Sequence, residues 1–314
     1  MAYVFLGIGF ALLLLGSEAI LRGGKGLFQA FGIPPFFVSL LIGSFAMAAP
    51  ELSVALQASA RGLPDIALGD IVGSSLANLL LVFGLGALIR PMPTPPRVVF
   101  RDGGAFLAAS LALVFIALGS FIGRPLGALL LAGWVGYLVL VSITDLGRTA
   151  EPYAAEPESG GALSFFLIAV GAVGLFFGAR LAIDFAVLMA RDFHLPQAAV
   201  ALTVVAFGTS LPELVSTLSS AARGHPNAIS GRIVASNVFN VLLVLGIAAV
   251  LHPMSIAPGL AQVDMPIMAA CAVGIPVLML FGWRLTRGQG IVLLLGYVAY
   301  VVSIGLRSGV HVHF

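Results

Sequence analysis

Two polar clusters interrupt long apolar stretches in the second half of the chain. Glu213 lies thirteen residues before Pro226, and Asn240 lies fourteen residues after it. On antiparallel helices that rise about 1.5 Å per residue, both side chains would lie roughly 20 Å from the turn, at one depth. A carboxylate at that depth of an apolar layer costs at least about 2.5 kcal/mol and usually marks an ion or substrate pathway. The pattern therefore predicts a buried polar site that includes Glu213.

The first cluster is Gly208-Thr209-Ser210-Leu211-Pro212-Glu213. Its proline is expected to break the helix and to free backbone carbonyls, which is how transporters build cation sites. In a soluble protein, Ser-Leu-Pro-Glu would be an ordinary capped helix start. This cluster begins in the middle of an apolar run, which favours the broken transmembrane helix.

The same polar pattern occurs twice. When the chain is shifted by 162 positions, Pro50-Glu51 falls on Pro212-Glu213 without a gap. Two further site positions keep the register, because Ser74 falls on Ser236 and Asn78 falls on Asn240. Each half contains five apolar runs, an odd number, so the halves must face opposite ways across the membrane. The sequence predicts an inverted repeat that brings Glu51 and Glu213 face to face.

The polar residues of the two clusters form a shell of hard oxygen ligands. Its members are Glu51, Glu213, Thr209, Ser210, Asn78, Asn240, Ser74, Ser236 and Asn237. Oxygens of this kind suit Ca²⁺ and Na⁺, whereas the absence of His and Cys argues against zinc or copper. A pair of protonated, hydrogen-bonded glutamates without a metal is the alternative. With both asparagines neutral, two negative charges would balance one Ca²⁺ or two monovalent ions.

The composition is that of a polytopic, all-α membrane protein. Of 314 residues, 60% are hydrophobic and 9% charged, and the mean hydropathy is +1.12. The fifteen cations are dispersed, so a nucleic-acid partner is not expected despite the net charge of +2. The single cysteine, Cys271, excludes internal disulfides and Cys-based metal sites. We expect no cofactor, a lipid bilayer as surroundings, and an oligomeric state that the sequence leaves open.

Ten apolar runs predict ten transmembrane helices. The predicted domains are a first five-helix repeat (1–145), a cytoplasmic linker (146–162) and a second five-helix repeat (163–314). The first apolar run is long and lacks a basic leader, so it is expected to remain as a helix. The predicted spans are 2–21, 34–60, 66–89, 103–121, 125–144, 163–188, 196–222, 228–251, 264–282 and 288–306.

Loop cations predict the orientation. With both termini outside, ten of the fifteen Lys and Arg residues fall on the inner side and five on the outer side or at span ends. The positive-inside rule then favours outer termini in the bacterial inner membrane.

The remaining acidic residues are expected to be structural. Glu18 with Arg22, and Arg180 with Asp184, are four apart and should pair along one helix face. The remaining candidates are expected to lie at the membrane interface and not to bind ions: Asp65, Asp70, Asp102 and Asp264.

The two clusters resemble the α-repeats of the sodium/calcium exchangers, in the calcium/cation antiporter superfamily. The second repeat is carried by Gly208-Thr209-Ser210-Leu211-Pro212-Glu213 and Ala235-Ser236-Asn237-Val238-Phe239-Asn240, and the first by Pro50-Glu51 and Gly73-Ser74-Ser75-Leu76-Ala77-Asn78. The resemblance implies alternating access, Ca²⁺ between the two glutamates, and Na⁺ sites formed mainly by the hydroxyls of Thr209, Ser210, Ser74 and Ser236.

The first repeat departs from the family pattern. Ala46-Met47-Ala48 stands where the family usually has Gly-Thr-Ser, and Asn240 where many members have aspartate. The Met47 backbone carbonyl can still coordinate an ion, but two hydroxyls are missing. We therefore expect one weak Na⁺ position and nearly electroneutral exchange.

The sequence favours a Ca²⁺/Na⁺ antiporter. A proton-coupled Ca²⁺ exchanger of the same fold is the alternative, with Glu51 and Glu213 titrating in place of Na⁺ binding. A cation channel is another alternative, which differs from an antiporter in having no obligatory counterflow. An intramembrane enzyme would need a catalytic motif that the sequence does not show.

Overall fold

The computed structural model describes residues 2–31, 44–145, 161–226 and 229–309. Its first half is helical apart from two short strands. The elements are α1 (Ala2–Ala30), α3 (Ser44–Ala60), α4 (Pro64–Leu76), α5 (Phe83–Ile89), β1 (Met92–Pro93), α6 (Gly103–Leu118), β2 (Phe121–Ile122) and α7 (Arg124–Asp145).

The second half repeats this order with one additional break. The elements are α8 (Gly161–Asp192), α9 (Gln197–Val200), α10 (Ala206–Thr209), α11 (Leu211–Ala222), α12 (Ile229–Phe239), α13 (Leu245–Leu251), β3 (Met254–Ser255), α14 (Met265–Leu280), β4 (Arg284–Leu285) and α15 (Arg287–Arg307). Five short π-helical segments join or begin these helices: Ala77–Val82, Val98–Asp102, Ala201–Val205, Asn240–Val244 and Leu260–Asp264.

The described residues contain eight helical spans that are long and apolar enough to cross a membrane, and one bent pair, Gln197–Thr209 with Leu211–Ala222. The chain is therefore an integral membrane protein. The predicted second span is described only from Ser44, because 34–43 lie outside the described residues, as does most of the predicted linker. The count of ten spans stays a prediction.

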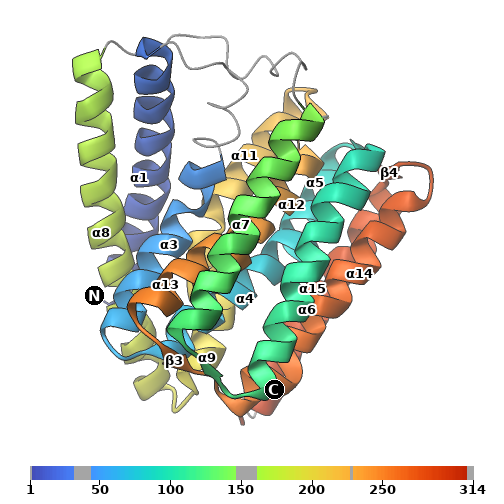
Figure 1. The fold of residues 1–314 in the computed structure, drawn as a ribbon. Helices are drawn as coiled ribbons and strands as arrows, with labels where there is room; N and C mark the ends of the chain where they lie inside the picture. The colour runs from blue at the N-terminus through green and yellow to red at the C-terminus, as the bar shows by residue number, and fades with distance from the viewer. Residues whose placement is uncertain (1, 32–43, 146–160, 227–228, 310–314) are drawn as a thin grey trace.

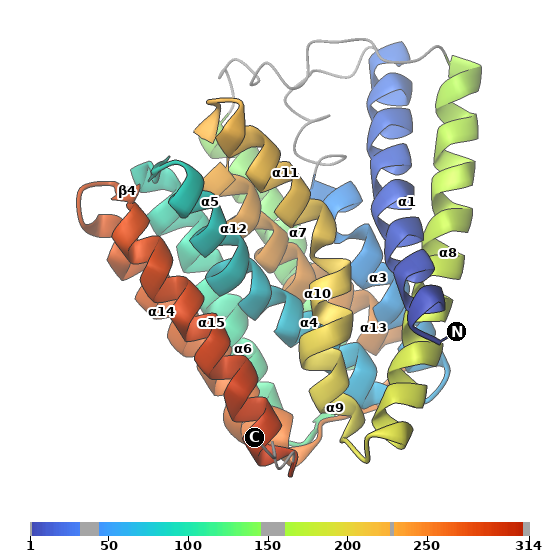
Figure 2. The ribbon, with the colours of Figure 1, turned by 180° about the vertical axis from the view of Figure 1, so that it is seen from behind.

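Two spans form the centre of the bundle. In an 18-residue apolar stretch of each of the spans 64–89 and 229–251, 83% of the residues are buried, against 22–39% in such stretches of the other six long spans. The outer helices α6, α7, α14 and α15 expose large apolar side chains such as Phe115, Leu129 and Leu295. An apolar exterior of this extent is suited to contact with lipid. Buried polar residues therefore belong mainly to the central helices. Figure 2 shows α4 and α12 enclosed between the outer helices and the α10–α11 segment.

Helices α1 and α8 pack next to each other, antiparallel, along one lateral side of the bundle (Figure 1). Glycines permit the close approach, because a Cβ on Gly16 would lie 2.9 Å from the Gly171 carbonyl oxygen, and one on Gly178 would lie 2.9 Å from the Gly9 oxygen. Such small-residue contacts are the usual way in which membrane helices pack without a hydrophobic driving force between them.

Matching contacts occur in both halves. Strand β1 pairs with β4, and β2 pairs with β3, so each pair joins one half to the other. Tyr137 donates a hydrogen bond of 3.1 Å to Asp102, and Tyr300 donates one of 3.1 Å to Asp264. These contacts agree with the repeat, and they place both aspartates in structural pairs away from the predicted site.

The predicted intrahelical ion pairs are only partly present. Arg22 and Glu18 lie 2.7 Å apart, as expected. Asp184 is 4.0 Å from Arg180, but it lies 2.5 Å from Arg61 at the end of α3. The ion pair between Asp184 and Arg61 therefore connects α8 to the end of α3. Residue spacing along one helix could not predict this contact.

Helix α1 contacts the broken helix through Phe10. A Cβ on Gly208 would overlap the Phe10 ring, whereas one on Gly7 would meet nothing within 4 Å. We predict that Gly208→Ala lowers stability by about 1–3 kcal/mol through overpacking, and that Phe10→Ala largely removes this penalty in the double variant. Thermal unfolding in detergent measures both effects, with Gly7→Ala as the control. Equal destabilisation with and without Phe10 would contradict the contact.

Candidate ion-binding site

The second-half cluster breaks its helix as predicted. Helix α10 ends at Thr209, Ser210 leaves helical geometry, and α11 begins with Pro212 in its first turn. The two segments differ in direction by 46°. Glu213 therefore lies in the first turn of α11, where its carboxylate is favourably placed near the helix N-terminus.

The first-half cluster is different, because Pro50 lies inside the continuous helix α3. Proline has no backbone N–H, so the carbonyl four residues earlier, on Ala46, loses its helical donor. The Ser17 hydroxyl of α1 donates to that carbonyl at 2.6 Å. A neighbouring helix thus replaces the missing bond, and the chain does not need to break.

Two of the three asparagines predicted as ligands lie in π-helical segments of the two central spans. Asn78 belongs to Ala77–Val82, and Asn240 begins Asn240–Val244. A π turn inside an α-helix is rare and is found mostly at functional sites. Here the two turns occupy equivalent positions of the repeat.

The predicted side-chain ligands are buried together in the bundle. Glu51, Glu213 and Asn240 are fully buried. Helix α3, which carries Glu51, packs against α12 and against the π-helical segment that begins at Asn240. Ser236 donates to Glu213 Oε1 at 2.8 Å. The structure therefore brings together groups from α3, α11, α12 and the second π turn.

Two other contacts connect the remaining predicted residues. Asn78 Nδ2 donates to Asn237 Oδ1 at 3.4 Å, and the hydroxyls of Ser74 and Thr209 lie 2.9 Å apart. Met47 and Ser210 are also buried, but no contact between their side chains and the other predicted ligands is described.

Most acceptor oxygens of this region have no hydrogen-bond donor among the described residues. They are Glu51 Oε1 and Oε2, Glu213 Oε2, Asn78 Oδ1, Asn240 Oδ1, Ser210 Oγ and Asp70 Oδ2. Buried polar atoms normally have partners, and leaving one unpaired costs about 1–3 kcal/mol. A dehydrated hard cation, which binds about six to eight oxygens, would satisfy them.

The side-chain chemistry limits the kind of cation. Among the described residues, no three His, Cys, Asp or Glu side chains are arranged to hold a metal ion. Amides and hydroxyls must therefore complete any coordination shell around the carboxylates, which suits Ca²⁺ or Na⁺ and does not suit a transition metal.

Asp70 corrects the sequence prediction. It was expected at the membrane interface, but it is fully buried, and its Oδ1 accepts a 2.8 Å hydrogen bond from Thr209. Ser74 lies 3.4 Å from the same oxygen. The signal was available in the sequence, because positions 70, 74 and 78 are four apart and share one helix face. The region therefore contains three carboxylates, which invalidates a charge balance based on two.

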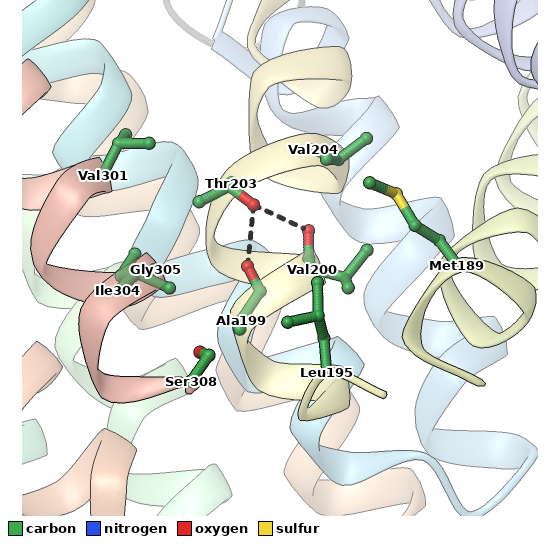
Figure 3. Close-up of a pocket in the computed structure, with 10 residues that line it drawn as sticks. All are labelled: Met189, Leu195, Ala199, Val200, Thr203, Val204, Val301, Ile304, Gly305 and Ser308. Carbon is green, nitrogen blue, oxygen red and sulfur yellow. Dashed lines mark hydrogen bonds between the residues drawn. The ribbon is translucent and has the colours of Figure 1, made fainter. Parts of the chain in front are cut away.

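An apolar pocket also occurs on the outside of the bundle. This groove of about 300 Å³ lies between α8, α9 and α15 and is lined mostly by apolar side chains (Figure 3). Its Thr203 hydroxyl already donates to the Ala199 carbonyl at 2.7 Å. Without unpartnered polar groups, the groove is not a candidate for the ion site.

Comparison with known proteins identifies the family. The profile described as "Sodium/calcium exchanger protein" matches residues 1–143 and 163–305. The chain belongs to this family. Inner membrane protein YrbG of Escherichia coli is 28% identical over 97% of each chain, and sodium/calcium exchanger MaX1 of Methanosarcina acetivorans is 25% identical over 96% of this chain and 97% of its own.

The fold is also that of a solved exchanger structure. The sodium-calcium exchanger NCX_Mj, soaked with Na⁺ and Sr²⁺, superposes with a TM-score of 0.69 at 24% identity, over 96% of this chain and 99% of its own. This similarity extends the family assignment to the arrangement of helices in space.

The unpartnered oxygens predict stabilisation by a divalent cation. Ca²⁺ at about one hundred times its dissociation constant should stabilise the wild-type protein by about 2.7 kcal/mol, because it binds only the folded state. Glu51→Gln should lose most of this stabilisation. The exposed Glu18→Gln, which makes the same chemical change away from the site, should keep it. Thermal unfolding with and without Ca²⁺ measures the effect, and equal shifts in all three proteins would contradict the site.

Proposed function

We propose that this protein is a secondary antiporter that exchanges Ca²⁺ for Na⁺ across the membrane by alternating access. The observation that carries the proposal is the set of buried, unpartnered oxygens around Glu51 and Glu213. Family membership supports the same reaction, since a family relative that covers nearly the same length is named a sodium/calcium exchanger. No cofactor is required, because the imposed gradient of one ion drives the other.

The two glutamates hold Ca²⁺ in this proposal. Stripping water from a divalent ion is expensive, and two carboxylates at one depth offset that cost most directly. Asn78 and Asn240 add amide oxygens from the two π turns. Because Ser236 donates to only one oxygen of Glu213, the other oxygen of that carboxylate remains available to the ion.

Na⁺ occupies the hydroxyl-rich part of the site in this proposal. Thr209, Ser210, Ser74 and Ser236 supply neutral oxygens, which suit an ion of single charge. Ser236, a proposed Na⁺ ligand, donates a hydrogen bond to Glu213, a proposed Ca²⁺ ligand. Binding of one ion therefore weakens binding of the other. That competition is the physical basis of exchange, since the carrier returns with one ion or the other.

Ca²⁺ uptake into sealed vesicles under separate Na⁺ and H⁺ gradients tests the function. We expect uphill Ca²⁺ accumulation when a Na⁺ gradient is imposed, and background flux for Glu213→Gln, which keeps the shape but removes the charge. Glu18→Gln should transport like the wild type. Flux driven by a pH gradient and indifferent to Na⁺ would establish the proton-coupled alternative. Downhill flux alone would indicate a channel.

We also propose that both termini lie on the outer side of the membrane and that the linker lies on the cytoplasmic side. The amino end of α1 and the carboxyl end of α15 lie at the same end of the bundle, and α8 begins at the opposite end (Figures 1 and 2). Together with the loop cations, this arrangement favours outer termini in the bacterial inner membrane.

Cysteine labelling tests the orientation. In a Cys271→Ala background, single cysteines at Ser159 and Ser308 should react with an impermeant reagent from opposite sides, with Ser308→Cys accessible from outside. A protein without cysteine is the control. Labelling of both positions from one side would refute the proposed topology.

A further inference from the structure

Asp70 lies at the contact between α4 and the broken helix. Its carboxylate is fully buried, and Oδ1 accepts from the Thr209 hydroxyl at 2.8 Å. The Ser74 hydroxyl lies 2.9 Å from Thr209 Oγ1 and 3.4 Å from both Asp70 Oδ1 and the Ala206 carbonyl oxygen. Four groups from two elements therefore converge on one small volume.

Two glycines make this convergence possible. A Cβ on Gly73 would lie 2.6 Å from the Leu202 carbonyl oxygen, and one on Gly69 would lie 2.7 Å from the Ala201 Cβ. Gly69 and Gly73 directly precede Asp70 and Ser74 in the sequence, so the same turn that brings the backbones together carries the polar side chains to Thr209. The geometry is built into the helix contact.

The cluster contains more acceptors than donors. Asp70 contributes two carboxylate oxygens, Thr209 and Ser74 contribute one hydroxyl oxygen each, and Ala206 contributes a carbonyl. Only the two hydroxyls can donate, and each has a single hydrogen. Asp70 Oδ2 is left without any partner. Thr209 Oγ1 also lies 3.3 Å from the Val205 carbonyl oxygen, so its hydrogen can turn to the backbone and leave its lone pairs free.

No basic side chain neutralises Asp70. Among the described residues, the carboxylate forms no ion pair, and it accepts hydrogen bonds from two hydroxyls. A buried, unpaired charge is strongly unfavourable, so this carboxyl group is stable only as the neutral acid or with a cation beside it. Hydroxyl and carbonyl oxygens around one carboxylate are the ligands of a hard cation.

The equivalent position in the second repeat cannot form the same site. Position 70 corresponds to Arg232, whose guanidinium donates to Ser216 and Ser220 at 3.0 Å each. One half therefore carries an acid where the other carries a base. The chain has a single cluster of this kind among the described residues.

We propose that Asp70 supplies a carboxylate ligand, and Ala206 a carbonyl ligand, to the Na⁺ that Thr209 and Ser74 bind. One carboxylate balances one positive charge, which favours a monovalent over a divalent ion. This inference rests on the proposed Na⁺ coupling.

The test compares Asp70→Asn with Asp65→Asn, which makes the same change five residues earlier on α4 at a half-buried position. Two quantities are measured: the Na⁺ concentration that half-saturates Na⁺-driven Ca²⁺ uptake, and the rate of Ca²⁺ self-exchange without Na⁺. For Asp70→Asn we expect the first to rise at least about tenfold, as for loss of a charged ligand. Self-exchange should fall by less than threefold, and Asp65→Asn should match the wild type in both.

A parallel loss of self-exchange and Na⁺-driven uptake in Asp70→Asn would assign the residue a structural role and overturn the proposal. An unchanged Na⁺ dependence would overturn it as well. Thermal stabilisation by Na⁺ alone, with no Ca²⁺ present, separates this inference from the proposed function: it should be present in the wild type and lost in Asp70→Asn even if no Ca²⁺ flux is found. If Asp70→Asn does not fold, Ser74→Ala removes one ligand of the same cluster and should raise half-saturating Na⁺ in the same direction.

Discussion

Three buried carboxylates without a described basic partner are the constraint on which this structure depends. Glu51, Glu213 and Asp70 are fully buried in the centre of an apolar bundle. Two of them accept from hydroxyls, but these neutral donors leave Glu51 Oε1 and Oε2, Glu213 Oε2 and Asp70 Oδ2 without partners. A bundle that holds such groups is stable in its charged form only when cations accompany them. In that charged form, ion binding stabilises the fold.

The helices that hold these groups are irregular at the positions where the ligands lie. In α10–α11 the chain breaks at Ser210, whereas Pro50 stays within α3 because Ser17 supplies a donor to the Ala46 carbonyl. Two π turns place Asn78 and Asn240 in the central spans. Irregular backbone at this depth is tolerated because protein, and not lipid, surrounds it.

The two halves of the chain share an architecture but not a set of charges. The contacts of Asp102 and Asp264 repeat closely, whereas the position of Asp70 is taken by Arg232 in the second half. The first half lacks the hydroxyls that Thr209 and Ser210 provide, and it carries an additional carboxylate instead. A repeat can therefore keep its helix packing while its two polar faces diverge, because packing depends on small residues along the helices and ion binding depends on a few side chains.

The sequence alone determined the class of protein and most of the candidate site. Apolar runs and a repeat of 162 residues predict a polytopic all-α protein, and the register places the polar clusters at one depth; the burial of Glu51, Glu213, Asn78 and Asn240 agrees with this. Periodicity within a helix is a local property, so these features could be predicted. Three contacts could not be predicted, because each depends on which helix lies opposite: the Thr209 partner of Asp70, the Ser17 donor that keeps α3 continuous, and the Arg61 partner of Asp184. Gly69 and Gly73 set that neighbour for Asp70, and only the tertiary structure shows that it is Thr209.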